Sequence, residues 1–89
     1  MVSDLEKAQI MLKLVRKGNW KHSYDREDHF RRGNRFEDLD NSIKELQRKG
    51  WIILHKKPKF EAYSLDTKYK REIVDFIEKN IPEVRGTIK

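Results

Sequence analysis

The sequence predicts an α+β domain that is mainly helical, with a three-helix core, a β-hairpin and a C-terminal helix. Three observations support this fold class. Residues 35–49 place apolar side chains at helical spacing, and Gly50 follows where that helix would end. Two alternating apolar runs, 51–54 and 60–65, flank a short basic turn, as the strands of a hairpin do. A chain of 89 residues has room for one such domain.

The first element is a helix that begins after Ser3. Ser3 and Glu6 have the spacing of a capping box, in which Ser3 accepts from the backbone of Glu6 and Glu6 reaches back. Gly18 is expected to end this helix. The apolar face of the helix consists of Leu5, Ala8, Met11, Leu12 and Val15.

The next segment has weaker patterning. Residues 19–24 carry aromatic or imidazole side chains at alternate positions, which fits either a short strand or an extended link. A short helix is expected over residues 25–31, with Asp25 as its N-cap and Phe30 as its main apolar side chain. The composition of residues 31–35 is that of a turn.

A third helix is expected over residues 35–49, with Asn34 as its N-cap and Glu37 at the reciprocal position. Its apolar stripe is narrow, so one face packs against the core. Trp51 follows the end of the helix and should pack beneath the hairpin. The stripe consists of Phe36, Leu39, Ile43 and Leu46.

The hairpin turn is expected over residues 55–59, where Pro58 suits a turn and would interrupt a strand. Asp66 is the predicted N-cap of the last helix. The buried face of that helix consists of Tyr69, Ile73, Phe76 and Ile77. We assign residues 1–80 to the domain and residues 81–89 to a flexible C-terminal tail with little to hold it.

The chain is strongly charged and basic. Charged residues make up 40% of it, the net charge is +6 and the mean hydropathy is −0.98, which favours a polyanionic partner. The absence of cysteine excludes disulfides and thiolate zinc sites and fits a reducing compartment. No apolar run approaches the roughly 20 residues of a membrane span, and the N-terminus lacks the apolar region of a signal peptide. We therefore expect a cytoplasmic protein.

The order of elements is helix, link, short helix, turn, helix, hairpin and helix. In this order the chain resembles the winged helix-turn-helix DNA-binding proteins, of the small archaeal and bacterial regulator type, over residues 5–80. The residues that carry the resemblance are Leu39, Ile43, Leu46, Gly50, Trp51, Ile52, Tyr63, Ser64 and Leu65. The resemblance implies a winged helix with the hairpin as its wing, duplex DNA as the partner and a role in transcription regulation.

Helical geometry adds candidate DNA-binding residues on the face opposite the apolar stripe. In a winged helix, this face of residues 35–49 would enter the major groove. Asn41 would pair with adenine, Glu45 would accept from cytosine, and Arg48 would reach guanine or phosphate. The full set on this face is Asn41, Ser42, Lys44, Glu45 and Arg48.

Basic residues flank that face on both sides. One cluster forms the turn before the third helix, and the other forms the wing over residues 55–60. We expect both to contact phosphates, with the wing on the backbone or in the minor groove. The clusters consist of Arg31, Arg32, Arg35, Lys56, Lys57 and Lys59.

Acidic residues on the third helix favour a second interpretation, because a carboxylate near phosphates costs affinity unless it meets a donor. These residues are Glu37, Asp38, Asp40 and Glu45. The alternative is a protein-interaction winged-helix module within a nucleic-acid complex. Only the net charge supports a binder of RNA or of an anionic membrane. Single-strand binding through Trp20 and Trp51 would need an open sheet face.

The helix at residues 66–80 is a candidate homodimer element. Its apolar stripe, Ile73, Val74, Phe76, Ile77 and Ile81, is wider than one small core needs. Two copies would present two recognition helices to half-sites about one helical turn apart.

No motif predicts catalysis, a cofactor or a metal. The serines lack a nucleophile elbow, and the glycines form neither a P-loop nor GxGxxG. His22, His29 and His55 lack the spacing of a ligand motif, even with acidic residues at 25–28. We expect a protein without enzymatic activity.

Overall fold

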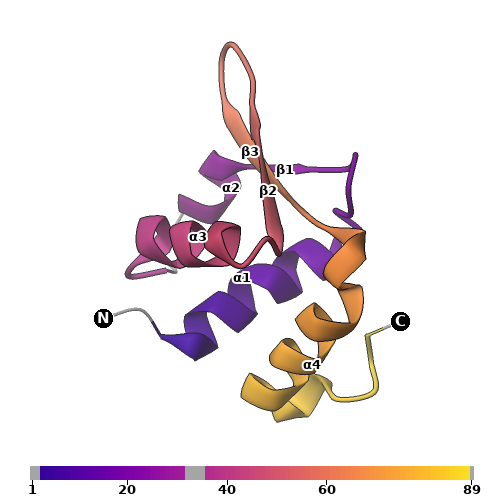
Figure 1. The fold of residues 1–89 in the computed structure, drawn as a ribbon. Coiled ribbons are helices and arrows are strands. Elements are labelled where there is room, and N and C mark those ends of the chain that lie inside the picture. The colour runs from indigo at the N-terminus through magenta and orange to yellow at the C-terminus, as the bar shows by residue number, and fades with distance from the viewer. Residues whose placement is uncertain (1–2, 32–35, 89) are drawn as a thin grey trace.

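The computed structural model describes residues 3–31 and 36–88. Over these residues the chain forms four α-helices and a three-stranded antiparallel sheet (Figure 1), which confirms the α+β class and is compatible with a winged helix. The elements are α1 (Asp4–Arg16), β1 (Asp25–Arg26), α2 (Glu27–Arg31), α3 (Leu39–Arg48), β2 (Ile52–Lys56), β3 (Glu61–Leu65) and α4 (Lys70–Asn80). Two short 3-10 helices, Thr67–Tyr69 and Pro82–Val84, lie before and after α4.

Helix α1 crosses the middle of the molecule and contacts α3, α4 and β3 (Figure 1). Because partners lie on several of its sides, its buried arc is wider than the predicted stripe. Ala8, Ile10, Met11 and Leu14 are fully buried. Burial of each large aliphatic side chain contributes roughly 1.5–3 kcal/mol. Leu5, which we expected on the buried face, is 48% exposed.

Strand β3 lies in the middle of the sheet, with β2 and β1 on its two sides. Strands β2 and β3 form the predicted hairpin and pair along their whole lengths. The backbone N–H of Lys57 donates to the carbonyl of Phe60 at 2.9 Å and closes the turn. His55 and Lys56, which we expected in the turn, belong to β2.

The two faces of the hairpin have different surroundings, because side chains alternate along each strand. On one face, Leu54 and Tyr63 lie beside α3. The other face carries His55 and Ser64. The connection from α1 to β1 covers this second face, since the Ser64 hydroxyl donates to the carbonyl of Lys21 at 3.0 Å.

Asp25 lies in β1 and does not cap α2, which corrects the prediction for this residue. It pairs with Tyr63 of β3 and is 5% exposed. Its carboxylate lies 2.5 Å from Nδ1 of His29 and 3.1 Å from Nζ of Lys17. Burial alone would raise the pKa of Asp25, but these two partners outweigh burial and lower it. Helix α2 therefore begins only at Glu27.

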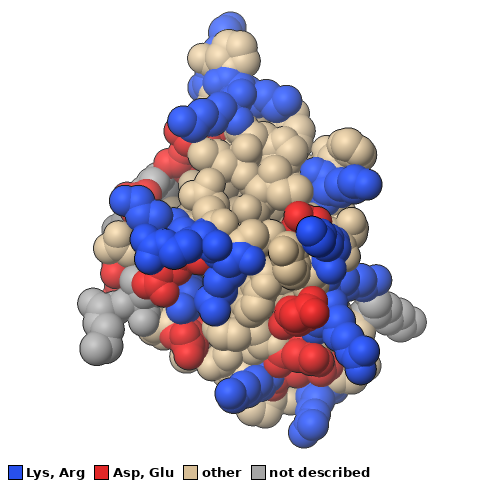
Figure 2. All heavy atoms as spheres, in the orientation of Figure 1, with Lys and Arg blue, Asp and Glu red and all other residues tan. Residues whose placement is uncertain are grey.

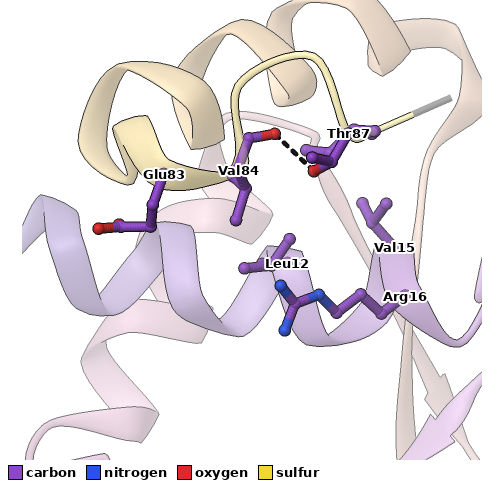
Figure 3. A pocket seen from close by; sticks show the side chains of 7 residues that line it. Leu12, Val15, Arg16, Glu83, Val84 and Thr87 are labelled. Carbon is purple, nitrogen blue, oxygen red and sulfur yellow. Dashed lines mark hydrogen bonds between the residues drawn. The ribbon is translucent and has the colours of Figure 1, made fainter.

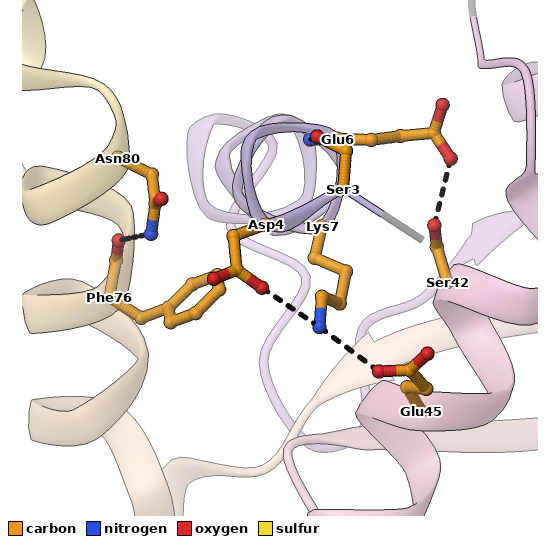
Figure 4. A network of polar contacts seen from close by, with 8 residues as sticks. All are labelled: Ser3, Asp4, Glu6, Lys7, Ser42, Glu45, Phe76 and Asn80. Atoms are coloured by element: carbon orange, nitrogen blue, oxygen red, sulfur yellow. Dashed lines mark hydrogen bonds and ion pairs between the residues drawn. The ribbon is translucent and has the colours of Figure 1, made fainter. Parts of the chain in front are cut away.

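A residue of α1 holds the N-terminus of α3. Ser3 accepts from the backbone N–H of Glu6 at 3.2 Å, which confirms half of the predicted capping box. The Glu6 carboxylate does not complete it. It accepts instead from the N–H groups of Glu37 at 2.8 Å and Asp38 at 3.2 Å. The Ser42 hydroxyl donates to the same carboxylate at 2.8 Å (Figure 4).

Helix α3 is shorter than the predicted range of 35–49. Its N-cap position is Asp38, whose side chain makes no capping hydrogen bond to the helix backbone. Glu6 instead accepts from the N–H groups of the two residues that precede the helix, Glu37 and Asp38. The prediction of Asn34 as the cap is therefore wrong for this helix, and Asn34 itself lies outside the described residues.

The apolar stripe of α4 is largely used inside the molecule. Ile73 and Ile77 are fully buried, and Ile81 is 7% exposed. The ring of Phe76 packs edge-on against Trp51, with their centroids 5.4 Å apart. Trp51 therefore packs against α4 at the base of the hairpin, where its carbonyl accepts from the Asp66 N–H at 3.0 Å.

The C-terminal segment packs against α1, which corrects the expectation of a flexible tail. Val84 is 6% exposed, and Ile88 packs against the core. The Thr87 hydroxyl donates to the Val84 carbonyl at 2.6 Å (Figure 3), and the Gly86 N–H donates to the Glu78 carboxylate at 2.8 Å. Between this segment and α1 lies an open cavity of about 470 Å³. Its lining consists of Leu12, Val15, Arg16, Glu83, Val84, Thr87 and Ile88.

Candidate nucleic-acid interface

The solvent-facing side of α3 carries three of the predicted DNA-binding residues. Asn41, Lys44 and Arg48 are exposed, while Leu39 and Leu46 anchor the opposite side in the core. Lys44 and Arg48 are one helical turn apart and project from the same side. The structure therefore brings an amide and two cations together on one exposed helix face.

Asn41 already has an intramolecular partner. Its Nδ2 donates to Oδ1 of Asp38 at 2.9 Å. Both groups lie at the first turn of α3, at the exposed edge of the helix. This bond uses one of the two N–H donors of the amide and orients the side chain; the second N–H and Oδ1 of Asn41 are the groups that would pair with a base.

Ser42 does not lie on this face, which corrects its assignment, whereas Glu45 is 42% exposed and has a partner from α1. Ser42 is fully buried and donates to Glu6. Glu45 points toward α1, where it accepts from Nζ of Lys7 at 3.1 Å (Figure 4). The buried surface of α3 is wider than its apolar stripe, because α1 covers one side of the helix and the hairpin covers another.

Lys7 lies between two carboxylates at the α1–α3 contact. Its Nζ is 3.0 Å from Asp4 and 3.1 Å from Glu45 (Figure 4), and the side chain is 7% exposed. Burial on its own would lower the pKa of Lys7, but the two ion pairs outweigh burial and raise it. Lys7 therefore keeps its charge and neutralises the carboxylate of Glu45 beside α3.

The hairpin tip carries the second predicted cluster. Lys56, Lys57 and Lys59 are all exposed, and Figure 2 shows basic side chains at the end of the projecting hairpin and again over α3. Because the side chains of a strand alternate, Lys56 lies on the α3 side of the hairpin and Lys57 on the opposite side. Nζ of Lys57 lies 5.2 Å from the centroid of the Tyr24 ring.

A shallow groove of about 240 Å³ separates α3 from the hairpin. It is lined by residues of α2, α3, β2 and β3: Glu27, Asp40, Ile43, Lys44, Gln47, Leu54, Glu61 and Tyr63. Acidic side chains outnumber basic ones along this groove. The basic surfaces of α3 and the wing are therefore divided by an acidic strip.

The arginine turn before α3 cannot be placed. Arg32 and Arg35 lie outside the described residues, as does the side chain of Arg31. Their assignment as phosphate contacts stays a prediction.

Sequence reasoning missed a hydrogen-bonded histidine in the wing. The Ser64 hydroxyl donates to the Lys21 carbonyl, so its oxygen is left to accept from Nε2 of His55 at 2.8 Å. Burial first, and then the charge of Lys57, lowers the pKa of His55 below its ordinary value of 6.5. The sequence showed only that side chains alternate between the two faces of the strand. Alternation does not show which segment covers each face.

The histidines do not come together. His29 contacts Asp25 and His55 contacts Ser64, while His22 is exposed in the connection before β1. Within residues 3–31 and 36–88 no group of three or more potential metal ligands is present. The same residues contain no helix with the length and apolar character that crossing a membrane requires.

No protein-family model, curated protein or solved structure matches the chain.

Proposed function

We propose that this protein binds double-stranded DNA as a winged helix-turn-helix transcription regulator. The observation that carries the proposal is the pairing of an exposed polar helix face with a hairpin whose projecting tip is basic. The helix face presents Asn41, Lys44 and Arg48, and the tip presents Lys56, Lys57 and Lys59. The net charge of +6 supports a polyanionic partner.

Helix α3 is the proposed reading element, because the major groove is wide enough to admit an α-helix. Arg48 has the fork geometry that suits guanine, and Asn41 has the paired donor and acceptor that suit adenine. Lys44 would contact phosphate or guanine. The buried Ser42 and the Lys7-bound Glu45 have no part in this contact; they fix how α3 sits on α1.

The wing is the proposed positioning element. Lysines contact phosphates as point charges and carry no sequence information of their own. The hairpin projects from the body of the molecule (Figure 1), so its tip can reach a backbone beyond the groove that α3 occupies.

Fluorescence anisotropy of a labelled random-sequence duplex, titrated at low and moderate salt, tests the proposal. We expect binding that weakens steeply with salt, because phosphate contacts release counterions. Replacement of both Lys44 and Arg48 by Gln should weaken binding at least tenfold, whereas Lys79→Gln with Arg85→Gln is the matched control. No binding at low salt would overturn the proposal.

The acidic groove favours one alternative, a protein-interaction module within a nucleic-acid complex. Glu37 and Asp40 are exposed on or next to α3, and Glu61 lines the groove beside the wing. Such a surface suits a basic partner. Recovery of one stoichiometric protein from native extract, together with no binding to duplex DNA, would favour this alternative.

A further inference from the structure

The hairpin face that points away from α3 carries its own cationic surface. His55, Lys57 and Phe60 alternate onto this face, and the connection from α1 to β1 packs against it. In Figure 1 the connection runs to the right of the hairpin, while α3 lies to its left. The two faces of the hairpin therefore border different parts of the molecular surface.

Three cations on this side are each held over an aromatic ring. Cζ of Arg26 lies 4.7 Å from the centroid of Phe60, and Nζ of Lys57 lies 5.2 Å from that of Tyr24. Nζ of Lys70, the first residue of α4, lies 5.8 Å from the ring of Trp20. Cation–ring pairs at exposed sites contribute about 0.5–1 kcal/mol each. These pairs restrict the rotation of long side chains that would otherwise be flexible.

These pairs form one continuous strip along the hairpin. Near the tip, the Tyr24 ring lies 6.2 Å from Phe60 and 5.0 Å from His55. Further down, His55 connects through Ser64 to Lys21, as described above. We call this strip the link face; it consists of Trp20, Lys21, Tyr24, Arg26, Phe60 and Lys70, while Lys57 at the tip belongs to the wing.

The lower end of the link face reaches α4. The N–H of Lys21 donates to the Leu65 carbonyl at 2.7 Å, and Trp20 forms a parallel bridge with the same residue. Leu65 ends β3, directly before the 3-10 helix that leads into Lys70. The cations thus follow a line from the hairpin tip to the start of α4.

Nearby carboxylates have partners. Asp25 is buried against Lys17 and His29, and Asp66 accepts from the N–H of Lys68 at 3.0 Å. Asp28 lies 3.3 Å from Nε of Arg26 at an exposed position, where a phosphate can compete with it. A phosphate on the link face would therefore displace Asp28 from Arg26.

The arrangement selects phosphate over bases as the ligand. Ring faces that stack on bases must be open, and here cations occupy them. Cations already held in place lose little freedom on binding, which favours a regular polyanion. A membrane surface would instead be met by apolar side chains; the described residues expose few large ones, and of these only Tyr24 lies on this face.

We propose that the link face binds the phosphate backbone of a second DNA duplex, so that one protein molecule bridges two segments. This inference rests on the proposed function of α3. The molecule measures 37 × 28 × 22 Å, whereas duplex DNA stays straight over about 500 Å. A duplex on α3 would have to bend sharply around the hairpin to reach the link face, which costs free energy that a second duplex does not.

A capture experiment tests the bridge. One duplex is fixed to beads, a labelled duplex of unrelated sequence is added, and labelled DNA retained by the protein is measured. The link variant is Arg26→Gln with Lys70→Gln, and the control is Lys79→Gln with Arg85→Gln, which makes the same charge change elsewhere. Thermal melting checks that both variants fold.

We expect wild type and control to capture the second duplex. The link variant should retain at least tenfold less labelled DNA. Binding of the link variant to a single duplex should stay within twofold of wild type. The slope of log affinity for the second duplex against log salt concentration should be smaller in magnitude by about 1.8, because each of the two lost phosphate contacts contributes about 0.9.

Several results would overturn the bridge. If wild type binds one duplex and never captures another, the bridge fails while the proposed function stands. If the link variant captures as well as the control, two copies bridging through α3 explain the result better. If wild type binds no duplex, the proposed function fails first. If the link variant lost binding to anionic vesicles but captured DNA as well as wild type, the link face would be assigned to membrane binding.

Discussion

At the scale of single residues, Glu6 connects two helices that are far apart in sequence. It lies in the first turn of α1, yet its carboxylate receives two backbone N–H groups and a hydroxyl at the start of α3. An anion at this position also interacts favourably with the helix dipole. The orientation of the proposed reading helix therefore depends on a side chain outside it.

Replacement of Glu6 by Gln should lower the free energy of unfolding by about 1–2 kcal/mol. The amide keeps one acceptor oxygen but loses the charge and the second acceptor. Urea denaturation measures the change, with Asp75→Asn on the exposed side of α4 as the control. An equal loss in both variants would show that the α3 contacts of Glu6 are not important for stability.

His55 makes stability depend on pH. In the folded protein its pKa is lowered, so the unfolded chain binds more protons in the window between 6.5 and the lower folded value. The contribution of His55 is therefore fully present above pH 6.5 and is lost as the pH falls through that window. The physical cause is the burial of a neutral ring that donates to Ser64.

Thermal denaturation between pH 7.5 and 4.5 measures this dependence in wild type and in His55→Gln. We expect the variant to be less stable at pH 7.5 and to lose less stability on acidification. Lys79→Gln, at an exposed position of α4, should follow wild type. A parallel pH profile for His55→Gln and wild type would contradict the assigned role of the ring.

At the scale of elements, the wing is the part whose contribution to DNA affinity is most easily isolated. Replacement of Lys57 and Lys59 by Ala should weaken binding to every duplex and reduce the salt slope by about 1.8. Anisotropy titrations at several salt concentrations give that slope. Unchanged affinity would remove the wing from the interface, and a change for some sequences only would assign it a reading role.

The C-terminal segment is a structural element of the domain. Deletion of residues 82–89 should cost about 2 kcal/mol or more of unfolding free energy, because Val84 is buried and Ile88 packs on the core. Val84→Ala alone should account for part of the loss, while Glu83→Ala at the neighbouring exposed position should have little effect. Guanidinium denaturation of the three variants distinguishes these cases.

At the scale of the whole molecule, a homodimer through residues 66–80 stays a prediction. Most of the apolar stripe that suggested it is used within one chain, by the core and by Trp51. Val74 remains partly exposed beside Ile88. Light scattering gives the mass directly: 10.8 kDa is the mass of one chain, and a dimer would have twice that value.

Much of the fold followed from signals that act over a few residues. Ser3 caps α1, alternation and a basic turn produce the hairpin, and the apolar stripe of α3 faces inward. Such features depend on hydrogen bonds and side-chain periods within one element. For the same reason, Asn41, Lys44 and Arg48 could be assigned to the exposed face of α3.

The errors and omissions all depend on contacts between distant parts of the chain. Ser42 appeared to be exposed and Glu45 appeared to have no partner, because Glu6 and Lys7 lie more than thirty residues earlier. Residues 81–88 appeared to be free because α1, against which they pack, is at the other end of the sequence. The pairing of β1 with β3 likewise joins residues that local patterns cannot relate.

Local patterns in this sequence were sufficient to predict the four helices, the hairpin and their order along the chain. Tertiary packing decided which polar residues of α3 reach solvent, where the C-terminal segment lies and which cations share a face. The physical reason is that a period or a cap is encoded within a few residues. An ion pair between two helices, or a strip made from three separate segments, exists only after the chain has folded.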